Sequence, residues 1–324
     1  MSDAAGGLSG AGERSKVLPY CNGCLAMTKL ICFGLGYSAR HYLASYGGRF
    51  EVVWATVRDA ERAADLNKRA PPGMTVFAFN GMVASADLCA AIAQTEAVLV
   101  SVPPDASGDP LLAICGEALT RAAPLQAIVY LSTVGVYGNY DGAWVDEDSE
   151  CRTTEERSLQ RLAAEQAWQS FGVRTGVTVT ILRLAGIYGP GRNTLETVQR
   201  GTAKRIVKPG QVFNRIHVAD IAQAIDASFK NHSNEIFNVA DDEPSAPGDP
   251  IVFAARLLEI EPPQEVSFAE ARVEMTELAK SFYAESKRVQ NLKLKSILGV
   301  KLRYPTYREG LSTLHHGSEK SLLG

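Results

Sequence analysis

The stretch that decides the fold is LICFGLGYSARHYLA, residues 30–44. It starts as an apolar, strand-like run, passes through Gly34-x-Gly36-x-x-Ala39, and continues as a helix-like segment that contains Ser38. Gly34 permits a tight turn, Gly36 lets backbone approach a pyrophosphate, and Ala39 allows close packing of helix on strand. The start of such a helix carries partial positive charge. The stretch therefore predicts a dinucleotide-binding turn.

Outward from this turn, strand-like and helix-like segments alternate along the chain. Short apolar runs are expected to form strands at 28–34, 50–57, 74–79, 96–102, 126–132 and 177–183. Helices are expected at 37–46, 59–69, 84–94, 109–122 and 154–172. Such alternation is typical of βαβ units around a parallel sheet with helices on both faces. The fold class is therefore α/β: a doubly wound, Rossmann-type parallel sheet with a smaller C-terminal lobe that faces the substrate.

The alternation breaks after residue 186, where loops rich in Gly and Pro follow. This break predicts a division of the chain into a dinucleotide-binding domain and a substrate-facing lobe. We expect the first to span 27–186, with its sheet completed by about 214–240, and the second to span 187–213 and 241–324. Residues 1–26 lack hydrophobic periodicity and are expected to be a disordered extension or the product of a misplaced start codon.

Composition excludes several classes of function. The 324 residues include 33 basic and 36 acidic ones, for a net charge of -3, so we expect no nucleic-acid partner. No run approaches the roughly 18 apolar residues that cross a bilayer, so no membrane partner is expected. Six irregularly spaced cysteines indicate reduced thiols in the cytoplasm. Cys21-x-x-Cys24 stands without a second pair or a nearby histidine, and no metal is expected.

The end of the second predicted strand indicates which cofactor binds. An NAD site usually carries an Asp or Glu there, whereas a basic residue accommodates the 2′-phosphate of NADP. This chain reads VVWATVRDAE (52–61), with Thr56 and Arg58 at that end. We therefore predict a small-molecule enzyme site with NADP preferred and NAD as the alternative. Two other interpretations stay open: Arg58 is simply solvated, or Asp59 binds the ribose.

Four further motifs follow the glycine turn in one order. They are YLSTVGVYG (130–138), ILRLAGIYGPGRN (181–193), NRIHVADIAQAI (214–225) and IFNVADDEP (236–244). From residue 28 to about 313, the chain resembles the extended short-chain dehydrogenase/reductases of the NAD-dependent epimerase/dehydratase type. The resemblance implies that the C-terminal lobe closes over the substrate, often a nucleotide-sugar. It also implies a homodimer paired through helices that include the one beginning near Glu155.

The chain departs from this family at the catalytic helix. The family pattern is Tyr-x-x-x-Lys followed by Ala-Glu, and aligning Ala164-Glu165 with that Ala-Glu puts Arg157 at the tyrosine and Arg161 at the lysine. A guanidinium, with a pKa above about 12, cannot act as a base at neutral pH. Arg157 can instead clamp an anionic substrate or stabilise an oxyanion, and Arg161 can hold ribose hydroxyls. The alternative is that both arginines pair with nearby carboxylates such as Glu156 or Glu165.

The resemblance implies roles for several other residues. Thr133, beside Ser132, stands at the position where a Ser or Thr of the family hydrogen-bonds the reacting oxygen of the substrate. Val134-Gly135 stands where dehydratases of the family have an Asp-Glu pair, and this difference disfavours sugar dehydration. Tyr137 and Tyr188 are expected to pack against the sheet edge, with an acid/base role as the alternative. Asp146 and Glu147 are expected to lie in a solvated loop, with binding of a cation or a sugar hydroxyl as the alternative. His217 and Asp220 are expected to be structural, with Asp220 fixing a local turn. Thr153-x-x-Glu156 predicts a capping box. SFYAESKRV (281–289) resembles a run in uncharacterised bacterial oxidoreductase-like proteins.

Two functions are compatible with these observations. The first is an NADP-dependent oxidoreductase or epimerase-like enzyme that acts on a hydroxyl or carbonyl substrate, with Thr133, Arg157 and Arg161 at the reacting end. The second is a non-catalytic NADP(H)-binding sensor or regulatory protein, suggested by the arginine at the tyrosine position. We favour the enzyme.

Overall fold

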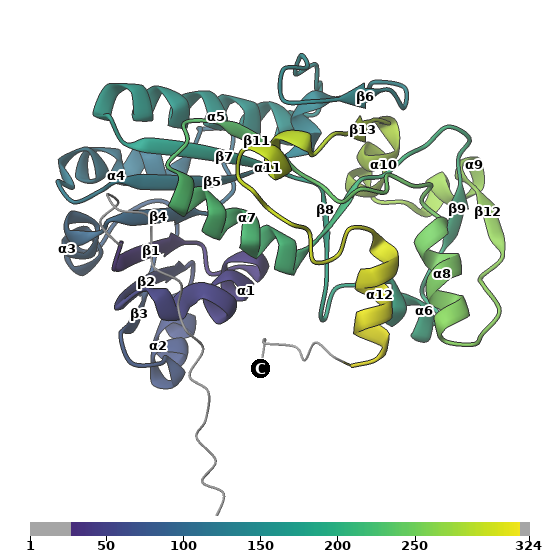
Figure 1. Ribbon diagram of the computed structural model, residues 1–324, viewed down its shortest axis with the longest axis horizontal. Coiled ribbons are helices and arrows are strands. Elements are labelled where there is room, and N and C mark those ends of the chain that lie inside the picture. The colour runs from purple at the N-terminus through teal and green to yellow at the C-terminus, as the bar shows by residue number, and fades with distance from the viewer. Residues whose placement is uncertain (1–26, 318–324) are drawn as a thin grey trace, which may run out of the picture.

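The structure, a computed structural model, describes residues 27–317, so the predicted extension and its two cysteines lie outside the described residues. Its centre is a seven-stranded parallel sheet with strand order β11-β7-β5-β4-β1-β2-β3 (Figure 1). In chain order these strands are β1 Lys29–Phe33, β2 Val52–Val57, β3 Met74–Ala78, β4 Ala97–Val100, β5 Ala127–Thr133, β7 Thr178–Leu184 and β11 Ile236–Val239. The predicted doubly wound α/β fold is confirmed.

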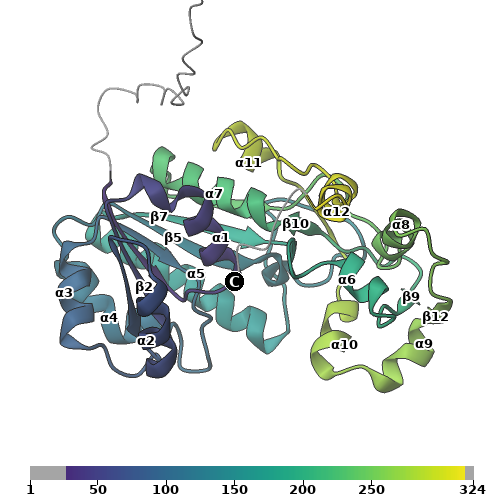
Figure 2. The same cartoon turned by 90° about the horizontal axis from the view of Figure 1, so that it is seen from below.

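Both faces of the sheet are buried, as its nearly continuous apolar strands require. In β1, Leu30 and Cys32 enter the core on one face, while Ile31 and Phe33 enter the core on the other. The first face is covered by α1 Tyr37–Tyr46, α2 Ala60–Arg69, α7 Val218–Asn231 and α11 Leu292–Ser296. The second is covered by α3 Ala86–Gln94, α4 Pro110–Arg121 and α5 Glu156–Thr175. In Figure 2, α7 and α4 accordingly lie on opposite sides of the sheet.

The order of the strands reverses between β1 and β4, and ligands of open α/β sheets bind at such a switch point. Gly34, directly after β1, has a φ of +89°, a conformation that side chains other than glycine rarely adopt. A Cβ atom at Gly34 would stand 2.9 Å from the Oγ atom of Ser101, which follows β4. Glycine is therefore required here by both conformation and space.

Apart from β11, α7 and α11, most segments after β7 build a lobe beside the sheet, at the right of Figure 1. Its helices α6 Thr194–Gln199, α8 Asp249–Leu257 and α12 Tyr307–His315 share a small apolar core. The lobe also contains α9 Phe268–Ala271, the 3₁₀ turn η3 Arg272–Glu274 and α10 Glu277–Ala284. Two further 3₁₀ turns lie outside the lobe: η1 Gly47–Arg49 after α1, and η2 Val134–Tyr137 after β5. Three short strand pairs complete the fold: β8 Gly186–Tyr188 with β10 Arg215–His217, β9 Arg205–Val207 with β12 Glu265–Ser267, and β6 Trp144–Val145 with β13 Arg288–Val289.

Two local predictions are wrong. Thr153 does not form a capping box with Glu156, because its Oγ1 atom accepts a hydrogen bond from the N–H of Glu155 (3.2 Å) and α5 begins only after Glu155. The segment after Trp144 is not a free loop either, since Glu147 Oε1 accepts from the N–H of Asn238 in β11 (2.7 Å). No helix within residues 27–317 has the length and apolar character of a membrane span.

Candidate functional site

A cavity of about 770 Å³ lies between the glycine turn and the lobe. Gly36 and Ser38 line it at the glycine turn, and Thr133 and Arg161 line it at the end of β5 and on α5. Lobe residues close the other side. The structure thus brings four of the predicted site residues to one cavity. Within the described chain, its lining does not include the predicted residues Gly34, Ala39, Thr56, Arg58 and Arg157.

The glycine turn has the geometry that a pyrophosphate needs. Gly36 has φ −84° and ψ −168°, which any residue can adopt, and a Cβ atom built there meets no atom within 4 Å. The space in front of its backbone is therefore open, while the first turn of α1 begins directly after it. This open cradle at a helix N-terminus fits the pyrophosphate of a dinucleotide. Ala39 is fully buried, as close packing of α1 on the sheet requires.

Thr56 lies beneath the turn rather than in the cavity. It is 1% exposed, and its Oγ1 atom accepts a hydrogen bond from the N–H of Gly34 (2.9 Å). From the other side, Ser101 Oγ donates to the carbonyl oxygen of Gly34 (2.5 Å). Thr56 and Ser101 together fix the turn that presents Gly36.

Arginines other than Arg58 also contribute positive charge near the end of β2. Arg58 is exposed there, and the carboxylate of Asp59 caps α2 by accepting from the N–H of Arg62 (2.7 Å). Asp59 therefore already has a structural partner. Arg40 on α1 donates to the carbonyl oxygen of Leu35 (3.1 Å), and burial, followed by the charge of Arg62, lowers the pKa of Arg40. Arg40 and Arg62 are thus neighbouring cations, which spacing alone did not reveal.

The reacting end is built on the carboxyl end of β5. Thr133 ends that strand, and its Oγ1 atom accepts from the N–H of Gly135 (3.1 Å), so it caps the η2 turn. Arg161 donates to the carbonyl oxygen of Leu131 (2.9 Å) and to the hydroxyl of Tyr130 (3.1 Å). Arg161 is therefore held against β5 with its charge at the cavity.

Arg157 lies elsewhere. Its side chain is exposed, one turn before Arg161 on α5. The alternative that Glu165 pairs with these arginines is wrong, because the carboxylate of Glu165 binds Arg183 of β7 and Ser132 instead.

The Glu165 contacts form a buried polar cluster directly under Thr133. Glu165 and Arg183 are 1% and 3% exposed, and Arg183 donates from Nη2 and Nε to the carboxylate (2.7 and 3.2 Å). The hydroxyl of Ser132 donates to the same carboxylate. This cluster ties α5 to β5 and β7 and so fixes the strand end that carries Thr133.

Replacing Glu165 with alanine is expected to lower the free energy of unfolding by about 3 to 5 kcal/mol, because Arg183 would remain buried without a counter-charge. Denaturant unfolding followed by circular dichroism measures the change. The matched control is Glu117→Ala, which removes an exposed ion pair with Arg121 and is expected to cost less than about 1 kcal/mol. A loss for Glu165→Ala as small as that of the control would contradict this account.

Neither tyrosine candidate has the surroundings of an acid/base group. Tyr137 is fully buried and donates its hydroxyl to Asn238 Oδ1 (2.7 Å), and Tyr188 donates to the carbonyl oxygen of Thr306 (3.3 Å). Burial raises the pKa of each well above its ordinary value. These contacts support the packing interpretation of both.

His217 and Asp220 are structural, as expected, although Asp220 acts at longer range than a local turn. His217 Nδ1 accepts from the N–H of Ala219 (3.2 Å) at the start of α7, and burial lowers the pKa of His217 to about 3. Asp220 accepts from the backbone N–H groups of Arg303 (2.6 Å) and Tyr304 (3.0 Å). It therefore fixes the segment that leads into α12.

A lysine of the lobe, Lys287, also lines the cavity, and no sequence motif predicted its place there. Lys287 is 6% exposed, and its Nζ atom donates to the carbonyl oxygen of Gly138 (2.6 Å) and to Glu285 Oε2 (2.6 Å). Burial lowers the pKa of Lys287, against the opposing effect of Glu285. Because Gly138 follows the η2 turn that Thr133 caps, the ammonium lies at the other end of that single turn.

The segment that carries Lys287 is held from two sides. The N–H groups of Tyr140 and Gly142 donate to the carbonyl oxygen of Ser286 (2.9 and 3.0 Å). Asn214 Nδ2 donates to the carbonyl oxygen of Lys287 itself (2.9 Å). The SFYAESKRV run was the available signal, but its position at the cavity follows only from these long-range contacts.

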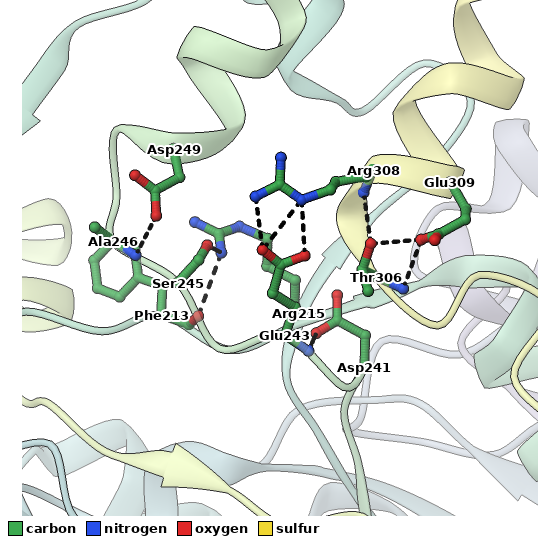
Figure 3. Close-up of polar contacts among 10 residues, drawn as sticks. All are labelled: Phe213, Arg215, Asp241, Glu243, Ser245, Ala246, Asp249, Thr306, Arg308 and Glu309. Atoms are coloured by element: carbon green, nitrogen blue, oxygen red, sulfur yellow. Dashed lines mark hydrogen bonds and ion pairs between the residues drawn. The ribbon is translucent and has the colours of Figure 1, made fainter.

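A second missed residue, Arg215, lines the lobe side of the cavity. Figure 3 shows its guanidinium directed toward Ser245 and Phe213, behind the ion pair of Arg308 with Glu243. Arg215 lies in the NRIHVADIAQAI motif, two residues before His217.

Comparisons with known proteins agree with this architecture. A conserved protein of unknown function from Silicibacter pomeroyi is 39% identical, with a TM-score of 0.78, over 90% of this chain and 100% of that chain. MoeE5 in complex with UDP-glucuronic acid and NAD is similar in fold (20% identity, TM-score 0.70, 90% of this chain and 98% of that chain). So is UDP-glucuronic acid 4-epimerase from Bacillus cereus in complex with NAD (13%, 0.69, 89% and 97%). Among curated proteins, none matches.

The family model for the NAD-dependent epimerase/dehydratase family matches residues 111–240. This range runs from α4 to β11 and includes Thr133, Arg161 and the polar cluster around Glu165. The ordered motifs, the sheet topology and this match show that the chain belongs to the NAD-dependent epimerase/dehydratase family.

Proposed function

We propose that the protein is an NADP(H)-dependent oxidoreductase acting on a hydroxyl or carbonyl group of a small, sugar-like substrate. The observation that carries this proposal is the cavity itself, because it joins the glycine turn at Gly36 to Thr133 and to lobe residues such as Lys287. A cofactor on the turn and a substrate in the lobe would therefore share one space.

The residues along the cavity divide the work of binding. Gly36 and Ser38 would hold the pyrophosphate at the start of α1, and Arg161 would hold ribose hydroxyls near the reacting end. When bound, the nicotinamide cofactor supplies or accepts the hydride. The chain itself must orient the substrate oxygen and move its proton.

We assign the proton transfer to Lys287, with Thr133 orienting the substrate oxygen. Reduction of a carbonyl requires a hydride at its carbon and a proton at its oxygen, and oxidation of an alcohol requires the reverse. Arg157 does not line the cavity, and a guanidinium does not release a proton near neutral pH, whereas Lys287 does line the cavity. A lysine whose pKa is lowered by burial is suited to general acid/base catalysis.

The preference for NADP rests on the cations at the end of β2. Arg58 is exposed, Arg40 and Arg62 are near one another, and the carboxylate of Asp59 is engaged as a helix cap. A 2′-phosphate would neutralise this charge through bidentate contacts, and NAD offers no such group. NADP is therefore proposed here, although the neighbours MoeE5 and the Bacillus cereus epimerase are in complex with NAD.

Arg58→Ala is expected to weaken NADPH binding about tenfold and to leave NADH binding unchanged, because only the phosphate contact is lost. Calorimetric titration of both nucleotides measures this difference. Arg69→Ala, an exposed arginine paired with Asp65 at the far end of α2, is the matched control and should change neither affinity. Equal binding of both nucleotides to wild type, or an equal loss of both in Arg58→Ala, would refute the preference.

The position of Arg157 also favours a second candidate function, a non-catalytic NADP(H)-binding sensor. Arg157 stands where the family has its tyrosine. A guanidinium does not exchange a proton near neutral pH, and Arg157 is not among the described residues that line the cavity. Tight NADPH binding without any turnover would support the sensor. Hydride exchange with any added carbonyl or alcohol would eliminate it.

A further inference from the structure

Arg215 is fixed where the lobe meets the sheet. It begins β10 and pairs with Gly186 of β8, and its carbonyl oxygen accepts from the N–H of Asp241 (2.7 Å). Arg215 is one of the residues that line the cavity. Its backbone is therefore held on both sides at the cavity wall.

All polar contacts of this guanidinium are with neutral groups. Its Nη1 atom donates to Ser245 Oγ (2.7 Å) and to the carbonyl oxygen of Phe213 (3.3 Å), and its centre lies 5.6 Å from the ring centre of Tyr307. Among residues 27–317, no carboxylate forms an ion pair with Arg215, and no hydrogen bond uses its Nε or Nη2 atoms. Burial lowers the pKa of Arg215, against the opposing effects of Asp241 and Asp249.

The surrounding carboxylates are bound to other groups, as Figure 3 shows. Glu243 forms a two-pronged ion pair with Arg308 (2.8 to 3.2 Å). Asp249 accepts from the N–H of Ala246 (3.1 Å), and Glu309 accepts from the N–H of Thr306 (3.0 Å) in the capping box of α12. These three carboxylates therefore bind other groups, and none of them forms an ion pair with Arg215.

Asp241, the remaining acid, is buried and forms no ion pair with Arg215 among the described residues. It is 2% exposed, one carboxylate oxygen accepts from the N–H of Glu243 (3.2 Å), and the other has no hydrogen-bond partner among the described residues. Burial raises the pKa of Asp241 to about 8, against the opposing effects of the hydrogen bond from the N–H of Glu243 and of the charge of Arg215. Within residues 27–317, Arg215 therefore has no carboxylate at ion-pair distance.

We propose that the Nε–Nη2 edge of Arg215 binds an anionic group of the substrate, a carboxylate or a phosphate. Both groups present two oxygens that match this edge, and an anion would compensate a partly buried charge that has no ion-pair partner among the described residues. Ser245 holds Nη1 and so orients the edge. That the anion belongs to the substrate rests on the proposed function, because Arg215 and Thr133 line the same cavity.

The distance from the reacting end fits a substrate of modest size. Thr133 is the register partner of Leu184, and Arg215 is that of Gly186, two residues further along. From strand spacing and rise, the Cα atoms of Thr133 and Arg215 are at most roughly 16 Å apart. A monosaccharide or a short chain can therefore contact both residues, which places the anion several bonds from the reacting carbon.

The test is calorimetric titration of the full chain, with and without saturating NADPH, using glucuronate, glucose 6-phosphate and glucose as probes. We expect at least one anionic probe to bind at least tenfold more tightly than glucose, and the better anion identifies the group. Arg215→Gln should remove this difference, whereas Arg205→Gln, which breaks the ion pair with Glu265 on the same lobe, should preserve it. An anion preference that survives in Arg215→Gln, or that wild type does not show, would overturn the proposal.

Thermal unfolding separates a binding role from a structural one. Because the unpaired charge is removed, ligand-free Arg215→Gln should have a Tm equal to or above that of wild type, and a Tm lower by several degrees would indicate a structural arginine. If Arg215→Gln does not fold, Arg215→Lys retains the charge without the two-pronged edge and should still lose anion affinity severalfold. Anion binding without NADPH binding would refute the proposed function alone, and NADPH binding without anion preference would refute this inference alone.

Discussion

Gly36→Val is expected to abolish dinucleotide binding, raising the Kd for NADPH at least about 100-fold. A side chain at this position would project into the space in front of the turn, because a Cβ atom there meets no protein atom within 4 Å. The same observation means that valine finds room in the protein, and φ −84° with ψ −168° suits its backbone. Binding is therefore expected to fail while the fold persists. Calorimetry and thermal unfolding measure the two effects.

Gly48→Val is the matched control for this variant. Gly48 is also exposed, lacks a positive φ, and has no atom within 4 Å of a built Cβ, but it lies in η1, beyond the far end of α1. The control should bind NADPH like wild type. Unchanged affinity in Gly36→Val, or equal losses in both variants, would show that the dinucleotide does not lie on this turn.

Lys287→Arg is expected to lower kcat by about 10²- to 10⁴-fold, because arginine keeps the positive charge but cannot give up a proton near neutral pH. NADPH affinity should be unchanged, since Lys287 lies on the lobe side of the cavity. Lys287→Met should lose activity at least as far. If Lys287 only holds Gly138 and Glu285 in place, arginine would restore most of the activity that methionine loses, and the assigned proton transfer would be wrong.

The pH profile provides a readout that a purely structural lysine would not change. A general acid must be protonated, so the rate of carbonyl reduction should fall as pH rises through the pKa of Lys287. Because burial lowers that pKa, the fall should come below the range of an ordinary lysine, and it should be absent in Lys287→Arg. The matched controls are Lys204→Arg and Lys204→Met, at an exposed lysine paired with Glu274 on the same lobe.

The sheet could be predicted from the sequence because its evidence is local. The α1 helix has the predicted bounds 37–46, and each predicted strand overlaps one in the sheet, since apolar runs and the glycine turn report on neighbouring residues. The predicted start of α5 was wrong by two residues, because the Thr153 side chain accepts from the N–H of Glu155 in a short turn instead of capping the helix.

The site was less predictable because its parts come from distant segments. Thr133 and Arg161 could be named from the family pattern, and the structure places both at the cavity, while their roles stay predictions. Lys287 contacts Gly138, 149 residues away, and no spacing rule connects them. Arg215 is informative only because nearby carboxylates have other partners, which no sequence pattern records.

The measurement that tests the central claim most directly is oxidation of NADPH by the purified protein in the presence of keto acids, uronic acids and sugar phosphates with a free carbonyl. We expect at least one of these compounds to accelerate NADPH oxidation above the rate without substrate, with the acceleration lost in Gly36→Val and in Lys287→Arg. Tight NADPH binding without oxidation across the same compounds would contradict the enzyme and leave the non-catalytic sensor as the function.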